Sequence, residues 1–163
     1  MARFVGLFFF LDKEIIMIKL EGERISLTLE IKPMACPRPR VAGKFAYMPT
    51  SYLEWKNNAM TQIRNAIKIR HITDPVFLVL SFVYQRPQCY MRKCDPAERM
   101  LKGTKPDLDN LCKSVMDALQ QCKVIKDDSQ IVGLMAHKWY GAKRSDKKSE
   151  RNHIKIDIYP VKG

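Results

Sequence analysis

The distribution of hydrophobic and polar residues predicts four β-strands spread along the chain. Residues 24–32 and 153–159 alternate strictly between the two classes, a pattern typical of strands that are buried on one face. Residues 131–140 are expected to form another strand. Residues 76–84 are almost entirely apolar, which indicates a central strand that is buried on both faces of its sheet.

Two segments instead show the period of amphipathic helices. The first follows Pro49 and has the S-x-x-E spacing of a capping box at Ser51 and Glu54, and the second follows Pro106. We assign Trp55 to the buried face of the first helix rather than to base stacking, because it lies in the apolar stripe. The apolar positions are Tyr52, Trp55, Ala59, Ile63, Ala66 and Ile67 in the first segment and Leu108, Leu111, Val115, Ala118 and Leu119 in the second.

Three connecting segments stand out from the strands and helices. Residues 36–40 read CPRPR and form an extended loop that is stiffened by proline. Residues 41–48 are expected to form a short hairpin arm with Gly43 and Lys44 at its turn. Residues 85–106 are rich in Arg and Lys without a clear period, and so long a loop in a compact domain is usually functional or disordered.

The length of 163 residues suits one domain with a sizeable core. We expect residues 21–163 to form this domain and residues 1–20 to be an N-terminal extension without a targeting role, because no small-residue cleavage site follows its apolar run. The five cysteines include no CxxC pair, which favours a reduced, cytoplasmic location. No apolar run reaches the roughly 18 to 20 residues that a membrane span needs, so no membrane partner is expected.

The charge balance indicates an anionic partner. The chain has 29 Lys and Arg against 17 Asp and Glu, a net charge of +12. Such an excess favours a nucleic acid as the partner, because contacts between basic side chains and phosphates release counterions and so contribute to binding. General solubility and solvated turns are the alternatives. The candidate DNA contacts are Arg38, Arg40, Lys44, Lys105 and Lys138.

Acidic residues are nevertheless concentrated in residues 105–130, which contain Asp107, Asp109, Asp117, Asp127 and Asp128. Two carboxylates at a helix entry and a third at a strand start can converge if helix and strand pack side by side. Oxygen ligands of this kind suit Mg²⁺ or Mn²⁺ rather than zinc. In a basic protein the substrate would be a phosphodiester. The alternative is that these aspartates only cap the helix and the turn.

The same stretch resembles the RusA family of Holliday junction resolvases. The shared motif is D-L-D-N-L-x-K, D-A-L and D-D-S-Q, which stand here at residues 107–113, 117–119 and 127–130. The P-R-P-R sequence at residues 37–40 and K-x-Y-G at residues 138–141 also resemble elements of that family.

The resemblance implies a homodimeric α/β (α+β) protein, with one domain built on a mixed β-sheet and packed helices. It implies Mg²⁺-dependent resolution of branched DNA, the four-way junction, by paired cuts. Asp107, Asp109 and Asp128 match the family's metal-site aspartates, and Lys113 matches its catalytic lysine. Asp127 is the adjacent acid of the motif. The competing hypothesis is a basic nucleic-acid-binding protein without catalytic activity.

Overall fold

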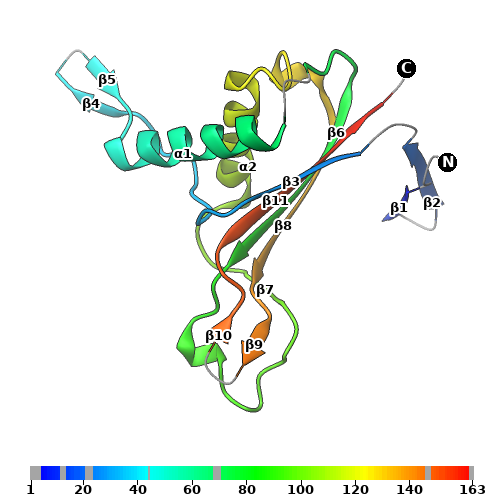
Figure 1. The fold of residues 1–163 in the computed structure, drawn as a ribbon, viewed down its shortest axis with the longest axis vertical. Helices are drawn as coiled ribbons and strands as arrows, with labels where there is room; N and C mark the ends of the chain where they lie inside the picture. Colours follow the sequence, from blue (N-terminus) through cyan, green and yellow to red (C-terminus); the bar gives the residue numbers. More distant parts are fainter. Residues whose placement is uncertain are drawn as a thin grey trace.

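The centre of the protein is a five-stranded mixed sheet. A computed structural model describes residues 5–11, 14–20, 24–43, 45–67, 71–145 and 148–161. The strands lie in the order β3-β11-β6-β8-β7, and β6 and β8 are parallel while the other neighbouring pairs are antiparallel (Figure 1). Their bounds are β3 (Ile25–Leu29), β11 (His153–Pro160), β6 (Val76–Tyr84), β8 (Ile131–Tyr140) and β7 (Met100–Leu101). The predicted α+β architecture with a mixed sheet is confirmed.

Two helices, α1 (Thr50–Ala66) and α2 (Leu108–Gln121), pack on one face of this sheet (Figure 1). Every second residue of the inner strands points toward them, and fully buried side chains such as Phe82 and Ile156 form the shared core. Trp55 is buried there as predicted, and its indole N–H donates to the Lys32 carbonyl at 2.8 Å. Burial of this apolar surface provides the main driving force for the fold.

The opposite face of the sheet carries a smaller cluster that contains no helix residue. Phe77 and Tyr159 are buried there, and Val79 and Met135 pack against them. Val83 is also fully buried, so β6 is covered on both faces, as its apolar run predicts.

The start of α1 differs from the prediction. Pro49 occupies the N-cap position, and no side chain caps the helix. Ser51 is therefore the second helical residue, where its hydroxyl lies past the position from which a cap is made. The predicted capping box is wrong. The far end of the predicted stripe also differs, because Ala66 is exposed while Ile67, just past the helix, is buried.

Three two-stranded units lie outside the main sheet. Strands β1 (Val5–Leu11) and β2 (Glu14–Leu20) pair antiparallel within the expected N-terminal extension. Strands β4 (Arg40–Ala42) and β5 (Phe45–Tyr47) form the predicted hairpin arm, which projects beyond the start of α1 (Figure 1). Strands β9 (Lys143–Ser145) and β10 (Lys148–Ser149) form a third hairpin. None of the described helices is long and apolar enough to span a membrane.

Candidate active site

The N-terminal end of α2 carries three of the predicted site residues. Asp107 is the N-cap with extended backbone angles, and Asp109 lies in the first helical turn. Both side chains are exposed, as is that of Lys113 one turn after Asp109. The helix starts after Pro106 because proline has no backbone N–H and its ring disfavours a helix that would extend before it. Negative charge is also favourable next to the unpaired N–H groups of the first turn. Buried residues of α2, including Leu111 and Val115, fix its other face against the core.

Two lysine side chains hold the segment that leads into Asp107. The ammonium group of Lys102 donates to the hydroxyl of Thr104 at 2.6 Å, to the Thr104 carbonyl at 3.1 Å and to the Lys105 carbonyl. The ammonium group of Lys138 on β8 donates to the carbonyls of Thr104 at 2.9 Å and Pro106 at 2.8 Å. Charge-assisted bonds of this kind are stronger than neutral ones. The entry to α2 is therefore tied to the end of the sheet.

Lys102 is itself almost fully buried. Burial lowers its pKa, and the nearby positive charge of Lys138 lowers it further. Its ammonium group also lies 5.0 Å from the ring centroid of Tyr84 and 5.5 Å from that of Tyr140. These rings offset part of the cost of burying the charge.

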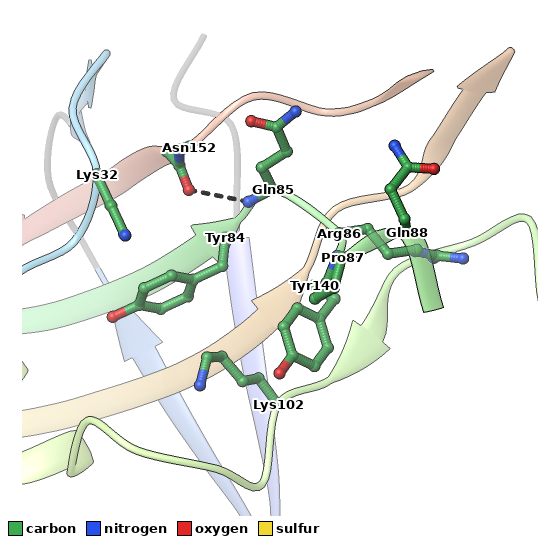
Figure 2. Close-up of a pocket in the computed structure, with 9 residues that line it drawn as sticks. All are labelled: Lys32, Tyr84, Gln85, Arg86, Pro87, Gln88, Lys102, Tyr140 and Asn152. Carbon is green, nitrogen blue, oxygen red and sulfur yellow. Dashed lines mark hydrogen bonds between the residues drawn. The ribbon is translucent and has the colours of Figure 1, made fainter. Parts of the chain in front are cut away.

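Tyr84 and Tyr140 end the parallel strands β6 and β8, where a hollow of about 480 Å³ opens (Figure 2). Carboxyl ends of parallel strands are a common place for ligand sites. Figure 2 shows Lys102 beneath the two tyrosine rings, with amide side chains on the far side of the hollow. The amide groups lining it belong to Gln85, Gln88 and Asn152.

The long loop between β6 and β7 is anchored by buried Arg86. Its guanidinium group donates to the carbonyls of Gly141 at 2.9 Å, Pro96 at 2.6 Å and Glu98. A second tie joins Arg99 to Glu150 at 2.7 Å. Bonding to Arg99 lowers the pKa of Glu150 to about 2, although partial burial opposes this shift. The loop contains a short 3-10 helix, η1 (Gln88–Tyr90), and it is held by these contacts within the loop and with the segment around the β9–β10 hairpin.

The acidic residues after α2 occupy a short 3-10 helix, η2 (Asp128–Gln130). Asp127 is its N-cap and accepts a hydrogen bond from the Ser129 N–H at 2.9 Å, which lowers the pKa of Asp127. Asp128 is exposed. The Gln130 amide donates to the carbonyls of Ile72 at 2.7 Å and Asp74 at 2.5 Å. These bonds fix η2 beside the start of β6.

The predicted aspartates do not converge within one chain. Helix α2 has 14 residues, which extends it about 21 Å, and Asp107 precedes it while Asp128 follows it. Helix α2 and β8 run in opposite directions (Figure 1), so the chain enters β8 near the C-terminal end of the helix. Among the described residues, no three His, Cys, Asp or Glu side chains are grouped to hold a metal ion. The expectation that side-by-side packing would bring them together is wrong, because packing alone does not set the relative direction.

The predicted DNA contacts fall in different environments. Arg38, Arg40 and Lys105 are exposed, the first two at the base of the hairpin arm and the third just before α2. Lys138 is half-buried and bonded to backbone carbonyls. Lys44 lies outside the described residues.

The sequence placed Arg86 and Lys102 in the basic loop and Tyr140 in the K-x-Y-G element, but it assigned none of the three a role of its own. A faint signal existed for Lys102, because Met100 and Leu101 interrupt a polar loop and indicate a short strand just before it. Nothing in the sequence shows that the ammonium groups of Lys102 and Lys138 and the guanidinium group of Arg86 donate to backbone carbonyls rather than to acidic side chains.

Comparison with known proteins identifies the family. The sequence profile of the family described as "Endodeoxyribonuclease RusA" matches residues 30–158. The chain is 38% identical over 74 residues to the "Uncharacterized protein YqaN" of Bacillus subtilis (strain 168), covering 42% of this chain and 51% of that protein. It is 40% identical over 60 residues to the "Crossover junction endodeoxyribonuclease rusA" of Lactococcus phage r1t, covering 37% of this chain and 40% of that protein.

The chain thus spans about half the length of these relatives or less, whereas the family profile extends from the residue after β3 into β11. It includes both ends of α2 and the hairpin arm. On this evidence the chain belongs to the RusA endodeoxyribonuclease family.

Proposed function

We propose that the protein is a magnesium-dependent endonuclease that resolves four-way DNA junctions by paired phosphodiester hydrolysis. The observation that carries this proposal is the pair of exposed carboxylates, Asp107 and Asp109, at a rigidly held helix entry inside the region that matches the family. The name of the Lactococcus phage relative supports a crossover junction as the substrate. The proposed setting is DNA recombination and repair by a phage or prophage protein in the cytoplasm, and the five free cysteines are compatible with that compartment.

The carboxylates of Asp107, Asp109 and Asp128 are the groups that would hold the metal. Their oxygen atoms suit Mg²⁺, with Mn²⁺ as a substitute, because both are hard cations. When bound, such an ion lowers the pKa of a water molecule and offsets charge on the scissile phosphate.

The lysines around the helix entry have separate roles in this proposal. The exposed ammonium group of Lys113 is near enough in sequence to Asp109 to share its helical face, where it would neutralise charge that develops on the phosphate. The ammonium groups of Lys102 and Lys138 keep the turn before Asp107 in place by bonding to its carbonyls. They therefore act on the position of the carboxylate and not on the substrate.

A homodimer would complete the site. One chain offers Asp107 and Asp109 at one end of α2 and Asp128 past the other end of this 14-residue helix, which is itself about 21 Å long. Two copies related by a two-fold axis, with their α2 helices antiparallel, would bring the first end of one copy to the second end of its partner. This arrangement creates two equivalent sites, which suits paired cuts in a junction that is itself approximately two-fold symmetric.

The test is cleavage of a synthetic four-way junction by the purified full-length chain. We expect symmetric nicks with Mg²⁺ and none with EDTA, and we expect Asp107→Asn to bind the junction without cutting it. Glu54→Gln is the control, since Glu54 is an exposed carboxylate on α1 and belongs to neither end of α2. A folded, dimeric wild-type protein that binds but never cuts would instead support the non-catalytic DNA-binding alternative.

A further inference from the structure

The β4–β5 arm exposes unusually large apolar side chains. Phe45 is 80% exposed, Val41 is 74% exposed and Tyr47 is 50% exposed. A two-stranded hairpin is marginally stable on its own, so such a surface on a projecting arm indicates a contact with another molecule. The proposed cleavage chemistry uses none of these three residues.

The two aromatic residues share one face of the arm with a cation. Phe45 and Tyr47 are two positions apart on β5, so their side chains leave the same face. Arg40 is the cross-strand partner of Tyr47, which places it on that face too. Val41 pairs with Ala46 on the opposite face. One side of the arm therefore combines two aromatic rings with a guanidinium group.

The base of the arm is fastened to the helix that carries the candidate active site. The Cys36 N–H donates to the Asn110 carbonyl at 2.9 Å. The Ser114 hydroxyl donates to the Met34 carbonyl at 2.8 Å. Both hydrogen bonds join the base of the arm, residues 34–36, to the first turns of α2. Between this base and the arm, Pro37 and Pro39 restrict the backbone.

The reach of the arm is short compared with DNA. The six residue steps from Cys36 to Ala42, followed by one strand spacing to Phe45, extend at most about 26 Å. One turn of duplex DNA is about 34 Å long. Phe45 and Tyr47 therefore stay within one helical turn of the phosphate that would be cut at α2.

We propose that Phe45 and Tyr47 form a base-stacking site for nucleobases exposed at the branch point of the DNA, with Arg38 and Arg40 on the adjoining phosphates. The proposal rests on the proposed function and extends it to how the branch is recognised. Aromatic rings bind unstacked bases without regard to sequence, and guanidinium groups bind phosphates. The arm would thereby set the distance between the branch point and the cut.

Charge favours DNA over a second copy of the chain as the occupant. Residues 37–47 contain three basic residues and no acidic one. The whole chain carries a net charge of +12. An arm of this charge is repelled by another copy and attracted by a polyanion.

The experiment compares binding of a four-way junction and a linear duplex without divalent metal, so that no cleavage occurs. We expect Phe45→Ala/Tyr47→Ala to lower junction affinity about tenfold or more while duplex affinity changes little. Phe45→Trp/Tyr47→Trp should retain junction affinity. Val41→Ala is the control from the opposite face and should bind as the wild type does. A 2-aminopurine base at the branch point should change its fluorescence with the wild type and much less with the double alanine variant.

Equal junction affinity for the wild type and the double alanine variant would overturn the proposal. So would a variant that becomes monomeric in sedimentation while the wild type is dimeric, because the arm would then hold a second copy. Cleavage with Mg²⁺ judges the proposed function separately. A wild type that cuts junctions, together with an alanine variant that binds them normally, refutes only the stacking site.

Discussion

The two ends of helix α2 are built in different ways. At its N-terminal end, the backbone before Asp107 is held by the ammonium groups of Lys138, on strand β8, and of Lys102, which directly follows β7. At its C-terminal end, Asp127 caps η2 through its bond to Ser129, which is only two residues away. The first end is held by side-chain ammonium groups from distant parts of the chain, whereas the second combines this local cap with bonds from the Gln130 amide to the distant carbonyls of Ile72 and Asp74.

This difference shows how the aspartates are divided. Each end presents exposed carboxylate, Asp107 and Asp109 at one and Asp128 at the other, but neither end of a single chain holds all three. Clustering three acids in one folded chain would raise their pKa values through mutual repulsion. Dividing them lets each copy fold without that penalty, and the proposed metal site would assemble only when two copies meet.

The largest expected effect on cleavage comes from substituting one aspartate at either end of α2. Asp107→Asn and Asp128→Asn should each reduce junction cleavage by more than about 100-fold, because loss of a metal ligand exceeds the 10- to 100-fold cost of losing an outer partner. Mixed dimers of the two variants should regain cleavage at one of their two sites. Co-expression with different affinity tags and measurement of single-strand nicking would check this.

The activity of the mixed dimer distinguishes a site shared between two copies from a site within one copy. A mixed dimer contains one site with both substitutions and one site with neither, provided that Asp107 and Asp128 of different copies cooperate. If both aspartates acted within one copy, each site would carry one substitution and the mixture would stay inactive. The dimeric state of each variant is the control.

A smaller effect should follow from loosening the N-terminal end alone. Lys138→Met removes the ammonium group that bonds to the Thr104 and Pro106 carbonyls while keeping most of the side-chain volume. We expect cleavage to fall about 10- to 100-fold and the half-saturating Mg²⁺ concentration to rise. Junction affinity without metal should change little.

Lys105→Met is the matched comparison, because Lys105 lies in the segment that Lys138 holds but its own side chain is exposed. It should weaken DNA binding without altering the Mg²⁺ requirement. The slope of log binding affinity against log salt concentration should fall by about 1, the contribution of one phosphate contact. A Lys138→Met variant that behaves in this second way would show that Lys138 contacts DNA directly.

The smallest effect concerns the loop between β6 and β7. Its ion pair between Arg99 and Glu150 lowers the pKa of Glu150 from 4.5 to about 2. A carboxyl group with a lowered folded-state pKa stabilises the fold above its unfolded pKa, and this stabilisation is lost as the pH falls from about 4.5 to about 2. Glu150→Gln should therefore lower Tm at pH 7 by a few degrees, as expected of a partly exposed pair worth about 1 kcal/mol.

Thermal unfolding at several pH values checks this prediction. The difference in Tm between wild type and Glu150→Gln should shrink as the pH approaches 2, and the exposed Glu98→Gln control should show no such trend. A constant difference across that range would mean that the carboxylate charge of Glu150 contributes nothing to the fold.

The sequence by itself predicted four strands of the main sheet, both long helices and the resemblance to the family. The apolar runs of β6 and β8 and the stripe of α2 identify these elements because burial imposes periods of two and 3.6 residues on any chain. The acidic motif of residues 107–130 is local, so its residues were recognised from spacing alone. The hairpin arm followed from the glycine and lysine at its turn, and Gly43 does adopt a positive φ of 62°.

Only the tertiary structure decided the direction of α2 relative to β8, and with it the separation of Asp107 from Asp128. Hydrophobic periodicity records which face of an element is buried but not which way the element runs past its neighbour. The partners of Lys102, Lys138 and Arg86 are likewise backbone carbonyls, which every residue possesses and no sequence pattern marks. The chain thus encodes its acidic residues locally, while long-range contacts determine where each one lies.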